Sequence, residues 1–338
     1  MGYDRFSVDF ATNLRQYDCV DRSATNLTEL WWDSEKERLF RLWCALENRS
    51  FSKSSDYERH RALCAMMTQL TGHPVKRHCR DFLQAHFSIS LPINEANCDE
   101  IWRMTADALM REPRSVRDLL DDNVRLLQRT DVPSDGIVPI LDASVLLELN
   151  APDCKAWQAK GHEILDDYAA CGCDTVYLSL GDRYSFVKPN PYNITQVLKT
   201  CGRSDEENDL MRSQTLRFLC AECKARGWRI VLAAEEACEL GLLLSYVQDE
   251  VGLPEVYVRA KRMRADMLLF SAMSMSVFPL LCLADYPSDG ELEGAIEHYA
   301  ARYPIDMLSV ACGGDPKNRA SDRARFNEIL NKWREKYD

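Results

Sequence analysis

The sequence predicts an α/β fold, a distorted (β/α)8 barrel of the TIM type with a helical insertion near its N-terminus. After residue 120, short and continuous apolar runs alternate with amphipathic helices. Apolar strands separated by helices are typical of a parallel sheet that is covered on both faces. The even alternation of strand and helix favours a barrel over an open doubly wound sheet. Before residue 120, the apolar spacing is mostly helical.

These patterns divide the chain into an N-terminal segment (1–22), a mostly helical insertion (23–120) and the barrel (121–338), together one structural unit. In the insertion, two sets of apolar residues recur at helical spacing, and Asn97 or Asp99 can cap the second helix. The first set is Leu30, Trp31, Leu39, Trp43 and Leu46, and the second is Ile101, Trp102, Met104, Ala108 and Leu109.

In the barrel region, strands and helices follow one another. The predicted strands are Val124–Leu127, Ile137–Leu141, Thr175–Leu180, Arg229–Ala234, Val277–Leu283 and Asp306–Val310. Helical stripes lie at Trp157–Tyr168, Leu210–Leu219, Leu292–Tyr299 and Phe326–Trp333, and Gly227 is positioned to end the second of these helices. The N-terminal 22 residues can supply a further strand, for which Arg15–Val20 is a weak pattern.

Composition and charge narrow the class of protein. The chain has 338 residues, of which 46% are hydrophobic and 28% charged, which is typical of a globular protein. The net charge of −11 argues against nucleic-acid binding, which requires neutralised phosphates. No apolar run reaches the length of a membrane span, and residues 1–10 lack the apolar core of a signal peptide. We therefore expect a cytoplasmic protein with no membrane partner.

The chain holds 14 cysteines. Cys220 and Cys223 form a C-x-x-C pair, but the pair lies within a helical pattern. A structural zinc site usually needs two such pairs on loops, and we find no second pair at workable spacing. The sequence therefore predicts small, buried and reduced thiols.

Several short motifs occur in the order found in one enzyme family. The densest stretch is Asp99-Glu-Ile-Trp102, followed by Ser115-x-Arg117 and by residues 123–133. Weaker matches are Asn26-Leu27, Leu30-Trp31, Gly72-x-Pro74, Phe87-x-Ile89, Asp166 to Cys173, Phe218 to Trp228 and Met307-Leu308 with Phe326, Ile329 and Leu330. Over most of residues 24–335 the chain resembles the uronate isomerases, a branch of the amidohydrolase superfamily.

This resemblance implies a distorted barrel and the aldose–ketose isomerisation of glucuronate or galacturonate. It also implies a divalent metal (Zn, Mn or Mg) that holds the sugar oxygens, a base that moves a proton between C2 and C1, and an arginine for the C6 carboxylate. The family's first strand ends in an H-x-H metal pair, whereas none of the six histidines here forms such a pair or precedes His60. The family's arginine and its catalytic histidine fall near Asp142 and Ala233. The chain is thus identified as a divergent homologue that lacks the family's metal and catalytic motifs.

Acidic residues nevertheless follow the predicted strands, at the end where barrel sites form. Converging carboxylates can bind Mg²⁺, Mn²⁺ or Ca²⁺, and two of them can act as an acid–base pair. Our candidate catalytic residues are Asp142, Asp182, Glu235 and Asp315. The alternative is that such residues cap the next helix. Other acidic residues at strand ends are Asp131, Glu236 and Asp285.

Basic residues beside these positions are candidates for substrate binding. Arg183 follows Asp182, and Lys317 and Arg319 follow Gly313-Gly314, which can cradle an anion or form a plain tight turn. A positive run at 259–264 is interpreted as a solvated face, with a carboxylate clamp as the alternative.

Three functions stay open: a rearranged isomerase of sugar-acid metabolism, an inactive barrel that binds a sugar acid or a protein, and a metal-dependent hydrolase or lyase. The expected partner is a small sugar acid, and a homo-oligomer is compatible with the sequence.

Overall fold

The computed structural model describes residues 6, 8–10, 22–47, 54–70, 73–120, 125–128, 138–181, 183–200, 202–234, 239–260 and 276–337. The chain folds into two compact units. Unit 1 contains Met1–Ala11, Asn123–Asp285 and Gly294–Gly313, and unit 2 contains Thr12–Asp122, Tyr286–Glu293 and Gly314–Asp338.

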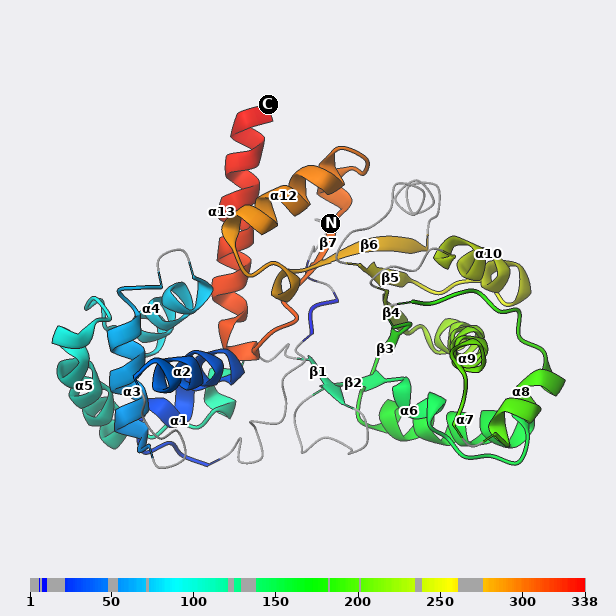
Figure 1. Cartoon of the computed structure of the whole chain (residues 1–338), viewed down its shortest axis with the longest axis horizontal. Coiled ribbons are helices and arrows are strands. Elements are labelled where there is room, and N and C mark those ends of the chain that lie inside the picture. The colour runs from blue at the N-terminus through cyan, green and yellow to red at the C-terminus, as the bar shows by residue number, and fades with distance from the viewer. Residues whose placement is uncertain are drawn as a thin grey trace. The chain divides into compact units, whose positions relative to one another are not determined.

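A curled parallel sheet is the centre of unit 1. Its described strands pair in chain order from β1 to β7, and every pair is parallel (Figure 1). The strands are β1 (Arg125–Gln128), β2 (Val138–Asp142), β3 (Thr175–Ser179), β4 (Arg229–Ala233), β5 (Val256–Arg259), β6 (Val277–Cys282) and β7 (Ser309–Ala311).

Helices connect β2 to β3, β3 to β4, β4 to β5 and β6 to β7, because parallel neighbours require a crossover. The central residues of β2 and β4 are buried consecutively, as expected for strands covered on both faces. The connecting helices are α6 (Ser144–Leu147), α7 (Cys154–Ala170), α8 (Pro191–Leu198), α9 (Asp205–Arg226), α10 (Leu240–Glu250) and α12 (Asp289–Ala300), of which the last crosses from unit 2 into unit 1. Gly227 ends α9 in the left-handed conformation with φ of 69°.

Side chains from the strands form an apolar cluster, and residues of the N-terminal segment belong to it. Val8 and Phe10 are almost fully buried, and they pack with side chains from the strands. The carboxylate of Asp9 accepts a hydrogen bond from the backbone N–H of Cys312 over 2.8 Å, so this segment lies beside the end of β7. The other members of the cluster are Leu127, Ile140, Tyr177, Val231, Tyr257, Phe278, Leu280 and Ala311.

Unit 2 is helical in its described part. A core around Trp31, Leu63 and Ile101 joins its helices. Ser55 begins α3 with a capping box in which Glu58 reciprocates, which explains why the helix starts there. The helices are α1 (Leu27–Trp31), α2 (Ser34–Leu46), α3 (Asp56–Met66), α4 (Pro74–Phe87), α5 (Cys98–Arg111) and α13 (Arg319–Tyr337), with short 3₁₀ turns at Glu95–Asn97, Arg117–Leu119 and Pro316–Asn318.

The α/β class and the parallel sheet are confirmed, and each of the six predicted strands has a counterpart. The last strand is shorter than predicted, because residues 305–307 form a 3₁₀ turn. β5 was not predicted, and the suggested strand at 15–20 lies outside the described residues. The domain boundaries at 22 and 120 stay predictions.

Candidate functional site

The carboxyl ends of the strands in unit 1 bring together a small group of polar side chains. Asp142 ends β2, Arg259 ends β5 and Asp285 follows β6. Tyr177 lies within β3 as the pairing partner of Asp142. We call Asp142, Tyr177, Arg259 and Asp285 the strand-end site. Its position agrees with the general rule that sites on parallel α/β sheets form at the carboxyl ends of strands.

Arg259 and Asp285 form a paired salt bridge in this site. The guanidinium donates from Nε to Oδ2 over 3.0 Å and from Nη2 to Oδ1 over 2.6 Å. The two side chains are only 20% and 21% exposed. The carboxylate of Asp285 raises the pKa of Arg259 against the opposing effect of burial. Arg259 is therefore a fixed positive charge, which differs from the predicted solvated face.

Tyr177 links this ion pair to the apolar interior. Its hydroxyl oxygen accepts a hydrogen bond from Nη1 of Arg259 over 3.3 Å. Burial raises the pKa of Tyr177, and the negative charge of Asp142 acts in the same direction. The phenol consequently stays protonated at neutral pH and keeps its own hydrogen as a donor.

The site therefore offers a fixed cation, a phenol and a carboxylate. A guanidinium bound on one edge by Asp285 can still present Nη1 to a ligand carboxylate or hydroxyl group. A carboxylate such as that of Asp142 can accept a proton and a phenol such as that of Tyr177 can donate one, as proton transfer between a hydroxyl-bearing carbon and a carbonyl carbon requires.

The metal implied by the family resemblance can be tested against the residues beside β7. At the end of the N-terminal segment, Val8 and Phe10 point into the apolar cluster, and Asp9 binds the backbone N–H of Cys312. Alkyl and phenyl groups cannot ligate a divalent cation. The described residues 8–10 supply no histidine pair of the kind that the family resemblance implies, and we derive no chemical step through a metal here.

Of the other predicted residues in unit 1, Asp142 and Arg183 are described. An Asp142 oxygen accepts a hydrogen bond from the backbone N–H of Ser144, the first residue of α6, over 3.0 Å, so this carboxylate contacts the helix start as well as lining the strand-end site. Arg183 is exposed. Asp131, Asp182, Glu235 and Glu236 lie outside the described residues, and their roles stay predictions.

Asp315, Lys317 and Arg319 lie in unit 2, where all three are buried. Asp315 caps the turn at Pro316–Asn318 by accepting from the backbone N–H of Lys317 over 3.0 Å. The Lys317 ammonium donates to the carbonyl oxygens of Leu30 and Trp32, at 2.9 and 3.0 Å. Burial lowers the pKa of Lys317. The structure thus holds these residues in internal contacts, and their catalytic and substrate-binding roles stay predictions.

A buried ion pair lies close to this group. Lys36 of α2 donates to the carboxylate of Asp33, the residue that caps the same helix. Both residues are 2% exposed. Burial by itself raises the pKa of the Asp33 carboxyl group. The positive charge of Lys36 and its hydrogen bonds outweigh this effect, so the pKa of Asp33 is lowered. The pair therefore joins the cap residue of α2 to the first turn of the same helix.

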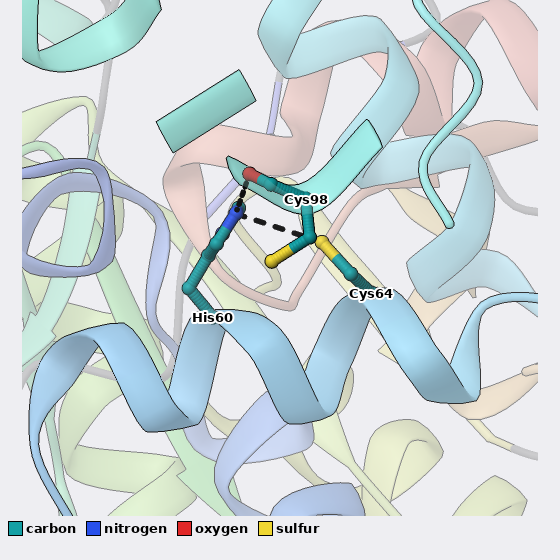
Figure 2. A group of neighbouring side chains, drawn as sticks. All are labelled: His60, Cys64 and Cys98. Carbon is teal, nitrogen blue, oxygen red and sulfur yellow. Dashed lines mark hydrogen bonds between the residues drawn. The ribbon is translucent and has the colours of Figure 1, made fainter. Parts of the chain in front are cut away.

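Sequence reasoning missed a second cluster of polar groups in unit 2. His60 and Cys64 project from one face of α3 towards Cys98, the first residue of α5, as Figure 2 shows. One ligand atom from each residue lies within 4.8 Å of the other two. The i, i+4 spacing of His60 and Cys64 on a helix was the available signal.

The described part of the chain contains no helix that is both long and apolar enough to span a membrane.

Comparison with known proteins supports the resemblance seen in the motifs. The sequence model of the glucuronate isomerase family matches residues 8–140. A uronate isomerase of Clostridium acetobutylicum is 30% identical over 122 residues, which cover 35% of this chain and 26% of that protein. A uronate isomerase of Halalkalibacterium halodurans is 23% identical over 247 residues, or 60% of this chain and 52% of that protein. The chain thus aligns with at most about half the length of these relatives.

Solved structures extend the likeness to the fold. The uronate isomerase of Thermotoga maritima superposes with a TM-score of 0.76 at 14% identity, covering 96% of this chain and 88% of that one. The glucuronate isomerase of Caulobacter crescentus gives 0.74 at 9% identity, covering 95% and 83%. The chain is therefore similar to the uronate isomerases over part of its sequence, and it shares their fold.

Proposed function

We propose that the protein belongs to sugar-acid metabolism and binds glucuronate or galacturonate at the strand-end site. The observation that carries this proposal is the half-buried Arg259, a fixed cation at the carboxyl end of β5. Relatives of the same fold are named for uronates, which carry one carboxylate and several hydroxyl groups. A uronate carboxylate suits the Nη1 edge of Arg259, and the Tyr177 hydroxyl suits a sugar oxygen.

Isomerisation is the reaction proposed for this site. It requires a base that removes a proton from C2 and an acid that protonates the carbonyl oxygen. Asp142 and Tyr177 are the described candidates for these roles. Asp182 and Glu235 are further predicted catalytic residues of unit 1, and Arg183 is a predicted substrate-binding residue. The proposal includes a closed eight-stranded barrel with an N-terminal helical insertion, and a location in the cytoplasm.

Binding without turnover is the second candidate function. It is favoured by the sequence, in which no histidine precedes His60 and no H-x-H pair occurs, and by the apolar packing of Val8 and Phe10 beside β7. In this case the strand-end site holds the sugar acid, and no proton is transferred.

Proton NMR of the purified protein with each sugar, in D₂O and with and without Mn²⁺ or Zn²⁺, tests both candidates. Saturation transfer reports binding, and ketose formation with deuterium at C2 reports isomerisation. Arg259→Gln should abolish binding. Arg229→Gln is the matched control, because Arg229 makes a more exposed salt bridge with Glu255 in unit 1.

The outcomes separate the two candidates. Ketose formation supports the isomerase, and binding without conversion supports the binding protein. If neither sugar binds at millimolar concentration, or if Arg259→Gln binds as well as the wild type, the proposed function is wrong.

A further inference from the structure

The strongest group of chemically reactive side chains outside the strand-end site is the cluster of His60, Cys64 and Cys98 in unit 2. All three residues are buried, at 0%, 0% and 2% exposure. They come from two helices, α3 and α5, that pack against each other. Two thiols and an imidazole are the ligand types that zinc prefers.

The spacing of the atoms matches a tetrahedral centre. Nε2 of His60 lies 3.6 Å from Sγ of Cys64. Zinc bonds of about 2.3 Å to sulfur and about 2.0 Å to nitrogen, at tetrahedral angles, place these two ligand atoms about 3.5 Å apart. The sulfur of Cys98 completes a triangle whose sides are all within 4.8 Å. Little movement is therefore needed to bring the three ligands onto one ion.

The imidazole is directed entirely at this cluster. Nε2 contacts the carbonyl oxygen of Cys98 at 3.1 Å as well as the Cys64 thiol. Nδ1 is buried and has no hydrogen-bond partner among the residues that the structure describes. The ring is held between Trp31 and Trp102, with centroids at 5.7 and 5.1 Å. Figure 2 shows Nε2 directed at both the Cys98 carbonyl oxygen and the Cys64 thiol.

The thiol of Cys98 is suited to act as a thiolate. It is the first residue of α5, and a helix N-terminus favours a negative charge. A thiolate is the form of cysteine that binds a metal.

We propose that His60, Cys64 and Cys98 form a structural zinc site that clips α3 to α5. The carbonyl oxygen of Cys98 or a water molecule supplies the fourth ligand. When both thiols start protonated, binding of one Zn²⁺ forms two Zn–S bonds and one Zn–N bond and releases two protons to solvent.

Cobalt substitution tests the proposal on the full chain. The protein is stripped with a chelator under reducing conditions and titrated with Co²⁺. We expect a thiolate-to-cobalt charge-transfer band and intense d–d bands that saturate at one equivalent and disappear when Zn²⁺ is added. Cys98→Ser and His60→Ala should weaken Zn²⁺ binding at least about 100-fold in a chelator competition. Cys220→Ser is the matched control and should bind normally, since it removes a buried thiol of the C-x-x-C pair in unit 1.

A measurement on the wild type alone covers the case in which the variants fail to fold. X-ray absorption at the zinc edge should show two sulfur neighbours at about 2.3 Å and light-atom neighbours at about 2.0 Å. Absence of the charge-transfer band, a shell of nitrogen and oxygen only, or an effect of Cys220→Ser equal to that of Cys98→Ser would each overturn the proposal.

Discussion

The backbone N–H of Gly313 donates a hydrogen bond to the carbonyl oxygen of Phe10 over 3.0 Å. This contact joins the N-terminal segment to the residues just after β7. It holds Phe10 so that its ring lies 5.9 Å from the ring of Tyr177, at an interplanar angle of 59°. The segment is consequently part of the core of unit 1, and its side chains border the strand-end site.

Phe10→Ala should therefore destabilise unit 1 strongly. Removal of a fully buried phenyl ring costs about 3–5 kcal/mol, because apolar contacts are lost and a cavity remains. Phe10→Leu keeps most of the volume and should cost clearly less. The free energy of unfolding in urea measures both changes. A loss below about 1 kcal/mol for Phe10→Ala would show that the segment is not part of the core.

Arg259→Met should lower stability more than Arg229→Met. Removing Arg259 leaves the carboxylate of Asp285 without its paired donor in a half-buried place, and we expect a loss of about 2 kcal/mol after discounting for partial exposure. Arg229 and Glu255 are more exposed, at 32% and 54%, and such a pair contributes about 0–1 kcal/mol. Urea unfolding of the two variants measures the difference, and equal losses would contradict the role given to Arg259.

Lys36→Met should be among the most damaging changes in unit 2. It leaves the buried carboxylate of Asp33 unpaired, which costs about 3–5 kcal/mol. The double variant Asp33→Asn with Lys36→Met removes both charges and should recover part of this loss. Thermal unfolding at neutral pH tests the order. If the double variant is less stable than Lys36→Met, the unpaired charge is not the cause.

The same pair should contribute to acid unfolding. The folded-state pKa of Asp33 is lowered below its ordinary value of 3.8. The unfolded chain then binds more protons in this range, so the stabilisation is present above pH 3.8 and is lost as the pH falls through the folded-state pKa. The double variant should show a shallower fall of unfolding free energy below about pH 4. An unchanged slope would contradict this origin.

Gly227→Ala and Gly294→Ala should have opposite effects. Gly227 has φ of 69° and open space where a Cβ would lie, so alanine there meets only backbone strain of about 1 kcal/mol. Gly294 lies within α12 and is equally open, and alanine should stabilise the helix by up to about 1 kcal/mol. Melting temperatures of the two variants measure the signs, and a shared sign would refute the argument.

Local patterns predicted most of the sheet because β2, β3, β4 and β6 are continuous apolar runs. β5 was missed because Val256–Arg259 is only four residues long and leads into a basic run. That omission also hid the site. Asp285 was correctly selected as a residue at a strand end, but its partner Arg259 was interpreted as solvated, since nothing marked it as the last residue of a strand.

The remaining features could not be predicted from the sequence because they depend on contacts between residues that are far apart in the chain. His60 and Cys64 carry a helical spacing that is visible in the sequence, whereas Cys98 lies 38 residues beyond His60 and nothing local connects them. Likewise, no pattern around Val8 or Phe10 indicates that they pack beside the last strand. Such pairings depend on tertiary packing, which the spacing of apolar residues does not encode.

The contact between Asp9 and Cys312 spans 303 positions of the chain. During synthesis, the N-terminal segment therefore waits for its partner until almost all of unit 1 has left the ribosome. Val8 and Phe10 lack their packing partners Leu280 and Ala311 until β6 and β7 emerge, while earlier strands can already pair. Completion of the core is a late, high-contact-order step, and it is slow because a very long loop must close. Chaperone binding to the nascent chain should accordingly be strongest before β7 emerges.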